Sequence, residues 1–211
     1  MSTGLEEATG RILEELEKTS AAREIGLANS RKVTRLAANA IRALHRRDFT
    51  KAHSLLEEAS VLLEQASQVL APYPRVLWSG FLHDAQKEYA EACIYQAVVA
   101  AHPIPDHEEL KIPGVAWLHG VAETIGELRR AVLDWLREGH SHEAEKFFQV
   151  MEKMYEILLQ VDFPDSMTAG LRRATDAGRA ILERTRADLS LTIVQSRLEA
   201  ALARSVQAFS S

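Results

Sequence analysis

Apolar residues recur at helical spacing through most of this chain, and few residues interrupt the pattern. No proline occurs before Pro72, and the 211 residues include only 6 prolines and 10 glycines. Proline lacks an amide donor and clashes with the preceding helical turn, so its scarcity leaves long stretches free to form helices. No segment shows the alternation of apolar and polar residues that is typical of a strand. The sequence therefore predicts an all-α protein.

The prolines, glycines and capping residues divide the chain into about six to seven helices. We expect these helices to form one bundle, a single domain over residues 1–211. Asp48 and Ser141 are expected to cap helices at their first turns, and Gly139 is expected to end one. The predicted helices cover 5–47, 49–70, 76–101, 114–137 and 142–159, followed by one helix or a pair of helices that ends near 209.

The composition excludes several classes of protein. Acidic residues number 30 and basic residues 25, so the net charge of -5 argues against a strongly cationic chain, although a local basic patch remains compatible with it. The single cysteine, Cys93, excludes an internal disulfide and a cysteine-based zinc site. No apolar run reaches the length of a signal peptide or a membrane span. We therefore expect a cytoplasmic protein that does not associate with a membrane.

Acidic side chains share one face on each of two predicted helices. They are Asp84, Glu88 and Glu91 on the helix at 76–101, and Glu123 and Glu127 on the helix at 114–137. Residues three, four or seven apart lie on the same side of a helix. If the two faces meet, their like charges require a cation, and carboxylates suit hard ions such as Mg²⁺ or Mn²⁺. Such an ion activates water and stabilises the charge that develops on a phosphoryl group.

Other interpretations of these acidic faces stay open. Glutamate is a good helix former, and a row of glutamates is often only a solvated surface. A di-iron carboxylate bundle is a further alternative, but it needs Glu-x-x-His on two helices, and this motif does not occur in the chain.

Two glycines flank the acidic row of the helix at 114–137. Gly120 and Gly126 each cost about 1 kcal/mol relative to alanine inside a helix. Their position beside carboxylates indicates a close backbone approach or an access groove.

A basic row lies near the end of the first predicted helix. Six basic residues and no acidic residue occur between Arg31 and Arg47. Four of them recur at helical spacing and share one face: Arg31, Arg35, Arg42 and Arg46. Guanidinium groups donate a fixed fork of hydrogen bonds that fits phosphate, so these arginines are candidates for nucleic-acid binding. The alternative is that they pair with acidic residues in the bundle or at a subunit interface.

The two acidic elements also have a recognisable order and composition. The run Lys-Glu-Tyr-Ala-Glu-Ala occupies 87–92, and the run Leu-His-Gly-Val-Ala-Glu-Thr-Ile-Gly-Glu-Leu occupies 118–128. They resemble the Glu-Tyr-Val-Glu-Ala and Leu-Leu-Gly-Val-Ala-Asp-Leu-Thr-Gly-Glu-Leu elements of the translin superfamily, specifically of translin-associated factor X and its prokaryotic relatives. Leu-His-Arg at 44–46 matches a third element near the end of the early helix in that family. The resemblance spans most of the chain.

This resemblance implies a seven-helix subunit that assembles into a hollow homo-oligomer, a hexamer to an octamer. The factor X lineage carries a metal-dependent endoribonuclease site on the inner surface, which implies cleavage of single-stranded RNA. Glu88, Glu91 and Glu123 would be catalytic and would hold Mg²⁺ or Mn²⁺ together with Glu127. Glu123 falls where factor X has an aspartate, which is shorter by one methylene.

Two alternatives to the nuclease remain. Translin itself binds single-stranded RNA and DNA and lacks the full acidic set, so the resemblance also allows a non-catalytic oligomer that binds these nucleic acids. A helical scaffold, whose charges only fix the packing of subunits, is the third possibility.

Overall fold

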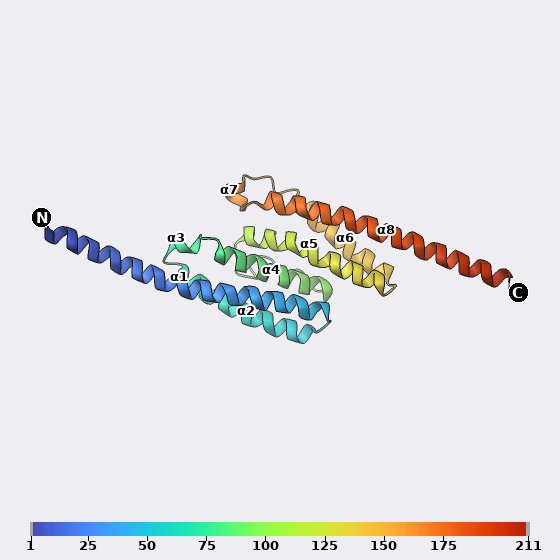
Figure 1. The fold of residues 1–211 in the computed structure, drawn as a ribbon, viewed down its shortest axis with the longest axis horizontal. Coiled ribbons are helices and arrows are strands. Elements are labelled where there is room, and N and C mark those ends of the chain that lie inside the picture. Colours follow the sequence, from blue (N-terminus) through green and yellow to red (C-terminus); the bar gives the residue numbers. More distant parts are fainter. Residues whose placement is uncertain (1, 210–211) are drawn as a thin grey trace. The chain divides into compact units, whose positions relative to one another are not determined.

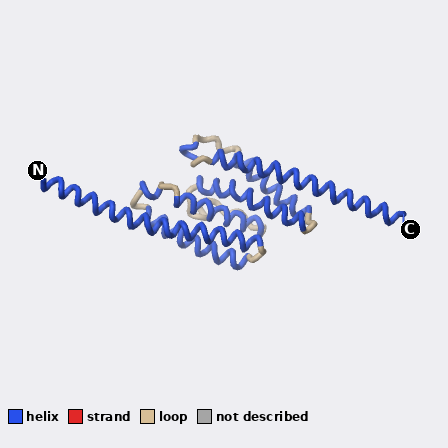
Figure 2. The backbone as a smooth tube through the Cα atoms, in the orientation of Figure 1, coloured by secondary structure: helices blue, strands red, loops and turns tan. Residues whose placement is uncertain are grey.

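A computed structural model describes residues 2–209 of the chain, and its regular structure is entirely helical (Figures 1 and 2). The helices within these residues are α1 (Ser2–His45), α2 (Phe49–Leu70), α3 (Pro74–Leu77), α4 (Phe81–Val99), α5 (Gly114–Arg137), α6 (Ser141–Leu158), α7 (Asp165–Thr168) and α8 (Leu171–Phe209). Six are long, and α3 and α7 are single turns. The prediction of an all-α fold is confirmed.

The chain divides into two compact units, Met1–Gly120 and Val121–Ser211. Unit 1 contains α1 to α4 and the first turns of α5, and unit 2 contains the rest of α5 together with α6, α7 and α8. Among the helices described, none is both long enough and apolar enough to cross a membrane.

Unit 1 is built on an antiparallel hairpin of α1 and α2, and α4 packs against both helices (Figure 1). The buried face of α2 follows a seven-residue repeat of alternating alanine and leucine: Ala52, Leu56, Ala59, Leu63, Ala66 and Leu70. Alanine in such a seam allows two helix backbones to approach closely. Gly26 on α1 extends the same contact, since a Cβ there would lie 2.6 Å from Leu70 Cδ1.

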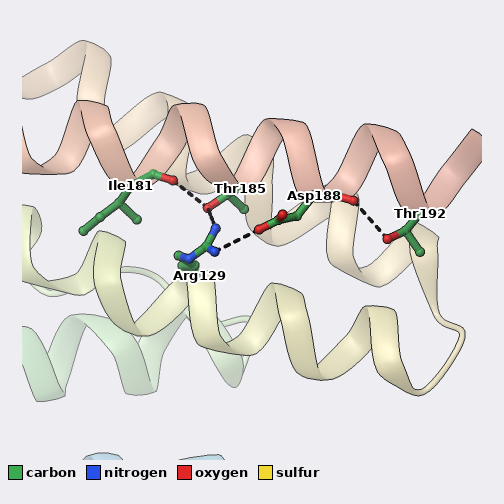
Figure 3. Close-up of polar contacts among 5 residues, drawn as sticks. All are labelled: Arg129, Ile181, Thr185, Asp188 and Thr192. Atoms are coloured by element: carbon green, nitrogen blue, oxygen red, sulfur yellow. Dashed lines mark hydrogen bonds and ion pairs between the residues drawn. The ribbon is translucent and has the colours of Figure 1, made fainter.

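Unit 2 is held together by an apolar core and by one polar bridge. Leu128, Met151 and Leu182 are among its buried side chains, and they come from α5, α6 and α8. Arg129 on α5 reaches across to α8, where its guanidinium donates to Asp188 Oδ2 at 2.8 Å and to Thr185 Oγ1 at 3.0 Å (Figure 3). The bridge fixes the rotation of α5 relative to α8, because both contacts are directional.

The outer ends of the two longest helices carry exposed apolar rows. The first part of α1, residues 4–21, is almost entirely exposed, as are residues 191–199 and 201–207 in the last part of α8. The exposed apolar side chains there include Leu5, Ile12 and Leu16 on α1 and Leu191, Val194, Leu198, Leu202 and Val206 on α8. Each of these side chains is more than half exposed in the single chain.

Several predicted boundaries are confirmed. Asp48 caps α2, since its carboxylate accepts a hydrogen bond from the Lys51 amide at 3.1 Å. The preceding residue, Arg47, has a φ of 60° and ends the first helix near the predicted position. Gly139 has a φ of 81° and separates α5 from α6 as expected.

Other predicted boundaries are wrong. The helix expected over 76–101 is interrupted by Gly80, whose φ of 98° separates the single turn α3 from α4. Ser141 does not cap α6, because it is already helical and His140 occupies the cap position. The last part of the chain forms a pair of helices, which the sequence prediction allowed, because Ala169 and Gly170 both have positive φ and separate the turn α7 from α8. Each error concerns a local left-handed residue or a one-residue shift of a cap.

The cap at Asp48 gives a test of this fold. Replacing Asp48 by alanine will lower the free energy of unfolding by about 1 kcal/mol, because the Lys51 amide loses its acceptor. Urea titration followed by circular dichroism measures the change. Asp48→Asn is the matched control and will keep most of the stability, since asparagine caps equally well. An equal loss in both variants would show that the charge of Asp48, rather than its cap, stabilises the helix.

Candidate functional site

The acidic residues of α4 lie in different environments although they share one side of the helix. Asp84 is exposed in the first turn, where the positive end of the helix dipole stabilises a carboxylate. The Glu88 side chain is about one-third exposed, and its Oε1 lies 3.6 Å from Lys87 Nζ. Glu91 is buried, with only 8% of its surface exposed. Burial of a carboxylate is costly unless polar or charged groups compensate it, which makes Glu91 the most constrained member of the row.

Gly120 explains why Glu91 is buried. A Cβ at Gly120 would lie 2.5 Å from Ala90 Cβ and 2.9 Å from the backbone nitrogen of Glu91. The start of α5 therefore meets the middle of α4 backbone against backbone at Glu91. The close approach that the sequence indicated for this glycine is confirmed.

Two histidines pack beside this contact. His119, which directly precedes Gly120, is buried, and its ring meets His83 of α4 edge to face with 5.3 Å between the ring centroids. Aromatic rings in this geometry attract each other, which stabilises the contact beyond the effect of burying the rings. The histidine pair thus fixes the first turns of α5 against α4 within unit 1. His83 was not identified from the sequence, since a lone histidine on a helix gives no spacing signal.

The second acidic pair belongs to unit 2. Glu123 and Glu127 lie one turn apart on α5, and both are partly exposed. Along α5 they follow His119 at intervals of four residues. Gly126, between them, has open space on its side-chain side, because no atom lies within 4 Å of an added Cβ.

Gly126 also lies at the end of a groove that runs along α5. The groove has a volume of about 430 Å³ and is lined by Gly126, Arg129, Arg130, Leu133, Asp134 and Arg137. An access groove was one of the two interpretations offered for the glycines, and it applies to Gly126 rather than Gly120. The arginines that line it were not singled out from the sequence, although Arg130 and Arg137 follow Glu123 at intervals of seven residues.

The acidic residues suit Mg²⁺ or Mn²⁺ by their chemistry. Within residues 2–209, no three His, Cys, Asp or Glu side chains form a group that could hold a metal ion. Of the four glutamates predicted for the site, Glu88 and Glu91 belong to unit 1, and Glu123 and Glu127 belong to unit 2. Magnesium is commonly bound through only one or two carboxylates, keeps several waters and takes further oxygens from a phosphate substrate. A pair of glutamates one turn apart therefore supplies the number and type of protein ligands that such an ion commonly uses.

The basic row of α1 is exposed along its length. Arg31, Arg35, Arg42 and Arg46 all face solvent, while the opposite side of α1 packs against α2 and α4. Arg42 donates to Asn39 Oδ1 at 2.6 Å. The alternative that these arginines pair with acids inside the bundle is not met within the described chain. Their pairing at a subunit interface and their binding to nucleic acid remain predictions.

A second groove lies on the other side of α4 in unit 1. It encloses about 540 Å³ between α2, α4 and the loop after α4, and Tyr89 and Cys93 form part of its wall. Burial raises the pKa of the Cys93 thiol to about 12, and burial together with the neighbouring Cys93 raises the pKa of the Tyr89 phenol. Both groups stay protonated at neutral pH, so this groove has no thiolate nucleophile.

Comparison with known proteins places the chain among related sequences. No protein-family model matches it. An uncharacterised protein of Methanocaldococcus jannaschii, MJ0175, is 33% identical over 187 residues, which cover 88% of this chain and 82% of that protein.

Solved structures match the fold. The structure of AfC3PO in complex with duplex RNA has a TM-score of 0.80 and 34% identity, covering 90% of this chain and 97% of the other. The crystal structure of AfC3PO gives 0.79 with the same identity and coverage. The crystal structure of apo-NeC3PO also gives 0.79, at 24% identity, with 87% of this chain and 96% of the other covered.

The two glycines of α5 predict opposite effects of the same substitution. Gly120→Ala will lower the free energy of unfolding by about 1–3 kcal/mol, because the new methyl group clashes with α4. The energetic cost of this clash exceeds the stabilisation that alanine gives through its higher helix propensity. Gly126→Ala will raise it by about 1 kcal/mol, because its Cβ enters open space. Urea unfolding measures both. Equal effects in the two variants would contradict the close contact at Glu91.

The buried thiol gives a second prediction. Cys93 will react with iodoacetamide more than about 100-fold more slowly in the folded protein than in urea at about pH 8, because the folded thiol stays protonated. Mass spectrometry of the alkylated protein measures the rates. Cys93→Ser removes the only cysteine and reports background labelling. Rapid alkylation of the folded protein would show that the thiol is ionised or freely accessible.

Proposed function

The chain belongs to the translin superfamily, and from this membership we propose that it is a metal-dependent endoribonuclease that acts on single-stranded RNA. One observation carries the proposal. Two glutamate pairs, each one turn apart, occur on α4 and α5 in the motif order of the nuclease lineage, and Gly120 packs against the backbone of one of them.

The proposal assigns a role to each acidic residue. In this proposal, Glu88, Glu91 and Glu123 would hold Mg²⁺ or Mn²⁺, and Glu127 would assist them. When bound, the ion lowers the pKa of water and offsets negative charge on the scissile phosphate. Glu91 contributes a fixed oxygen donor, because its backbone is held against α5 at Gly120. Glu123 and Glu127 are more exposed than Glu91.

The basic row of α1 guides the RNA backbone in this proposal. Arg31, Arg35, Arg42 and Arg46 present exposed guanidinium groups, which bind phosphates without reading sequence. The assembly proposed is a hollow homo-oligomer, a hexamer to an octamer, with the acidic residues on its inner face. The complex of AfC3PO with duplex RNA supports RNA as the ligand, and it makes duplex RNA a second substrate to assay.

One observation favours a second function, a non-catalytic oligomer that binds single-stranded RNA or DNA. Glu123 stands where the nuclease lineage has aspartate, and its extra methylene moves the carboxylate by roughly one bond length. Displacement of a ligand on that scale is enough to weaken catalysis while leaving phosphate binding by the arginines intact.

The nuclease predicts a specific loss in one variant. Glu123→Ala will reduce metal-dependent internal cleavage of a labelled single-stranded RNA by at least about 100-fold, because the ion loses a ligand. Assays with Mg²⁺, with Mn²⁺ and with chelator, read on a denaturing gel, measure the effect. RNA retention and the sedimentation coefficient will stay as in wild type.

Two further variants separate the alternatives. Asp176→Ala removes an exposed carboxylate of α8 and will leave cleavage unchanged, whereas Glu123→Asp restores the residue of the lineage and will retain cleavage. Wild-type cleavage by Glu123→Ala would refute the assignment of this residue. Bound but intact RNA in the wild-type protein, together with cleavage by Glu123→Asp, would establish the binding oligomer and locate its loss of chemistry at Glu123.

A further inference from the structure

The groove along α5 continues the acidic row of the same helix. Arg130 lies seven residues after Glu123, and Arg137 lies seven residues after Arg130. Two turns of helix bring each of these residues back to nearly the same side. One stripe of α5 therefore changes from acidic to basic over about 21 Å, the rise of 14 residues. All of its groove-lining residues belong to unit 2.

The groove has more positive than negative side chains, and these side chains differ in how far they are paired with opposite charges. Three guanidinium groups face one carboxylate, that of Asp134. Arg129 is already engaged by Asp188 and Thr185 (Figure 3). Arg130 is exposed and forms no ion pair within the described chain, and the Arg137 side chain, 83% exposed, lies 3.5 Å from Asp134. An exposed pair at that distance is weak, so Arg130 and Arg137 are available to an anionic ligand.

Gly126 has no structural reason to be glycine. Nothing lies within 4 Å of a Cβ at this position, in contrast to Gly120, and a glycine inside a helix costs about 1 kcal/mol relative to alanine. Its absent side chain keeps the groove open next to Glu127, at the point where the acidic part of the stripe meets the basic part.

We infer that Arg130 and Arg137 bind two backbone phosphates of the RNA beside the cleavage site, and that Gly126 leaves the space through which the chain passes. The inference rests on the proposed function, because it requires an RNA strand at Glu123. It adds a binding surface distinct from the α1 row and gives the strand a direction, from the glutamates toward the end of α5. The guanidinium groups are two turns apart, about 10.5 Å along the axis, so each binds its own phosphate.

The test measures binding without cleavage. Fluorescence anisotropy of labelled oligouridine is recorded in chelator, at salt concentrations between about 50 and 200 mM. The double variant Arg130→Ala/Arg137→Ala will bind at least about tenfold more weakly, and the slope of log K against log salt will fall by about 1.4, or 0.7 for each lost phosphate contact of a single strand. Arg172→Ala/Arg179→Ala is the matched control, since these arginines are exposed in the same unit and also seven residues apart. It will bind as wild type.

Variants of Gly126 test the passage independently of charge. Gly126→Leu will weaken binding to oligouridine severalfold without lowering the melting temperature, because the side chain enters the groove and its Cβ meets no described atom within 4 Å. Gly126→Ala will keep most of the affinity.

The outcomes separate the inference from the proposed function. Wild-type affinity and salt slope in the arginine double variant overturn the inference while the nuclease proposal stands. Loss of binding in the double variant and in the Arg172→Ala/Arg179→Ala control alike overturns it as well, since the effect would then be one of net charge. A changed sedimentation coefficient in the double variant overturns the inference too, because such a change would show that the groove forms a contact between subunits. Absence of RNA binding by the wild-type protein overturns both proposals together.

Discussion

Backbone contact between helices is the constraint on which the rest of this structure depends. Leucine cores hold most helical bundles together at a distance set by their side chains, but here small residues bring neighbouring helices into direct contact. Gly26 leaves room for the Leu70 side chain, and Gly120 brings the backbone of α5 against Ala90 and the backbone nitrogen of Glu91. A contact of this kind permits little sliding, because the backbone has no rotamers with which to adapt. It therefore fixes the backbone of Glu91, from which the carboxylate extends.

Much of this organisation can be predicted from the sequence. The long helices, the cap at Asp48 and the acidic rows depend on periodicity and on local residue chemistry, which a single sequence contains. The burial of Glu91 and the partial exposure of Glu88 could not be predicted from the sequence. The two residues are three positions apart and therefore lie only about 60° apart around the helix, so the neighbouring helix decides which of the two side chains is covered. The break at Gly80 was missed for a related reason. Glycine is compatible with a continuous helix, and only its positive φ shows that the chain turns there.

Helix α5 concentrates the chemistry of the protein. It carries the residue that packs against α4, a pair of glutamates and the arginines of the groove, and it is locked to α8 by Arg129 (Figure 3). In the proposed enzyme, the glutamates and arginines of α5 that belong to unit 2 lie on one helix, which sets their spacing along the RNA strand. Sites on helices are held more precisely than sites on loops.

The exposed apolar rows at the outer ends of α1 and α8 have a different consequence. A helical segment that packs against nothing gains little beyond its own hydrogen bonds, since most helical stability in proteins comes from packing of an apolar face. The order of these two helix ends is thus coupled to whatever surface covers apolar side chains such as Leu16 and Leu198. By mass action, the helix content of the protein then becomes a function of its own concentration when that surface belongs to another copy. Dilution would unwind the ends of the chain before it disturbs the core.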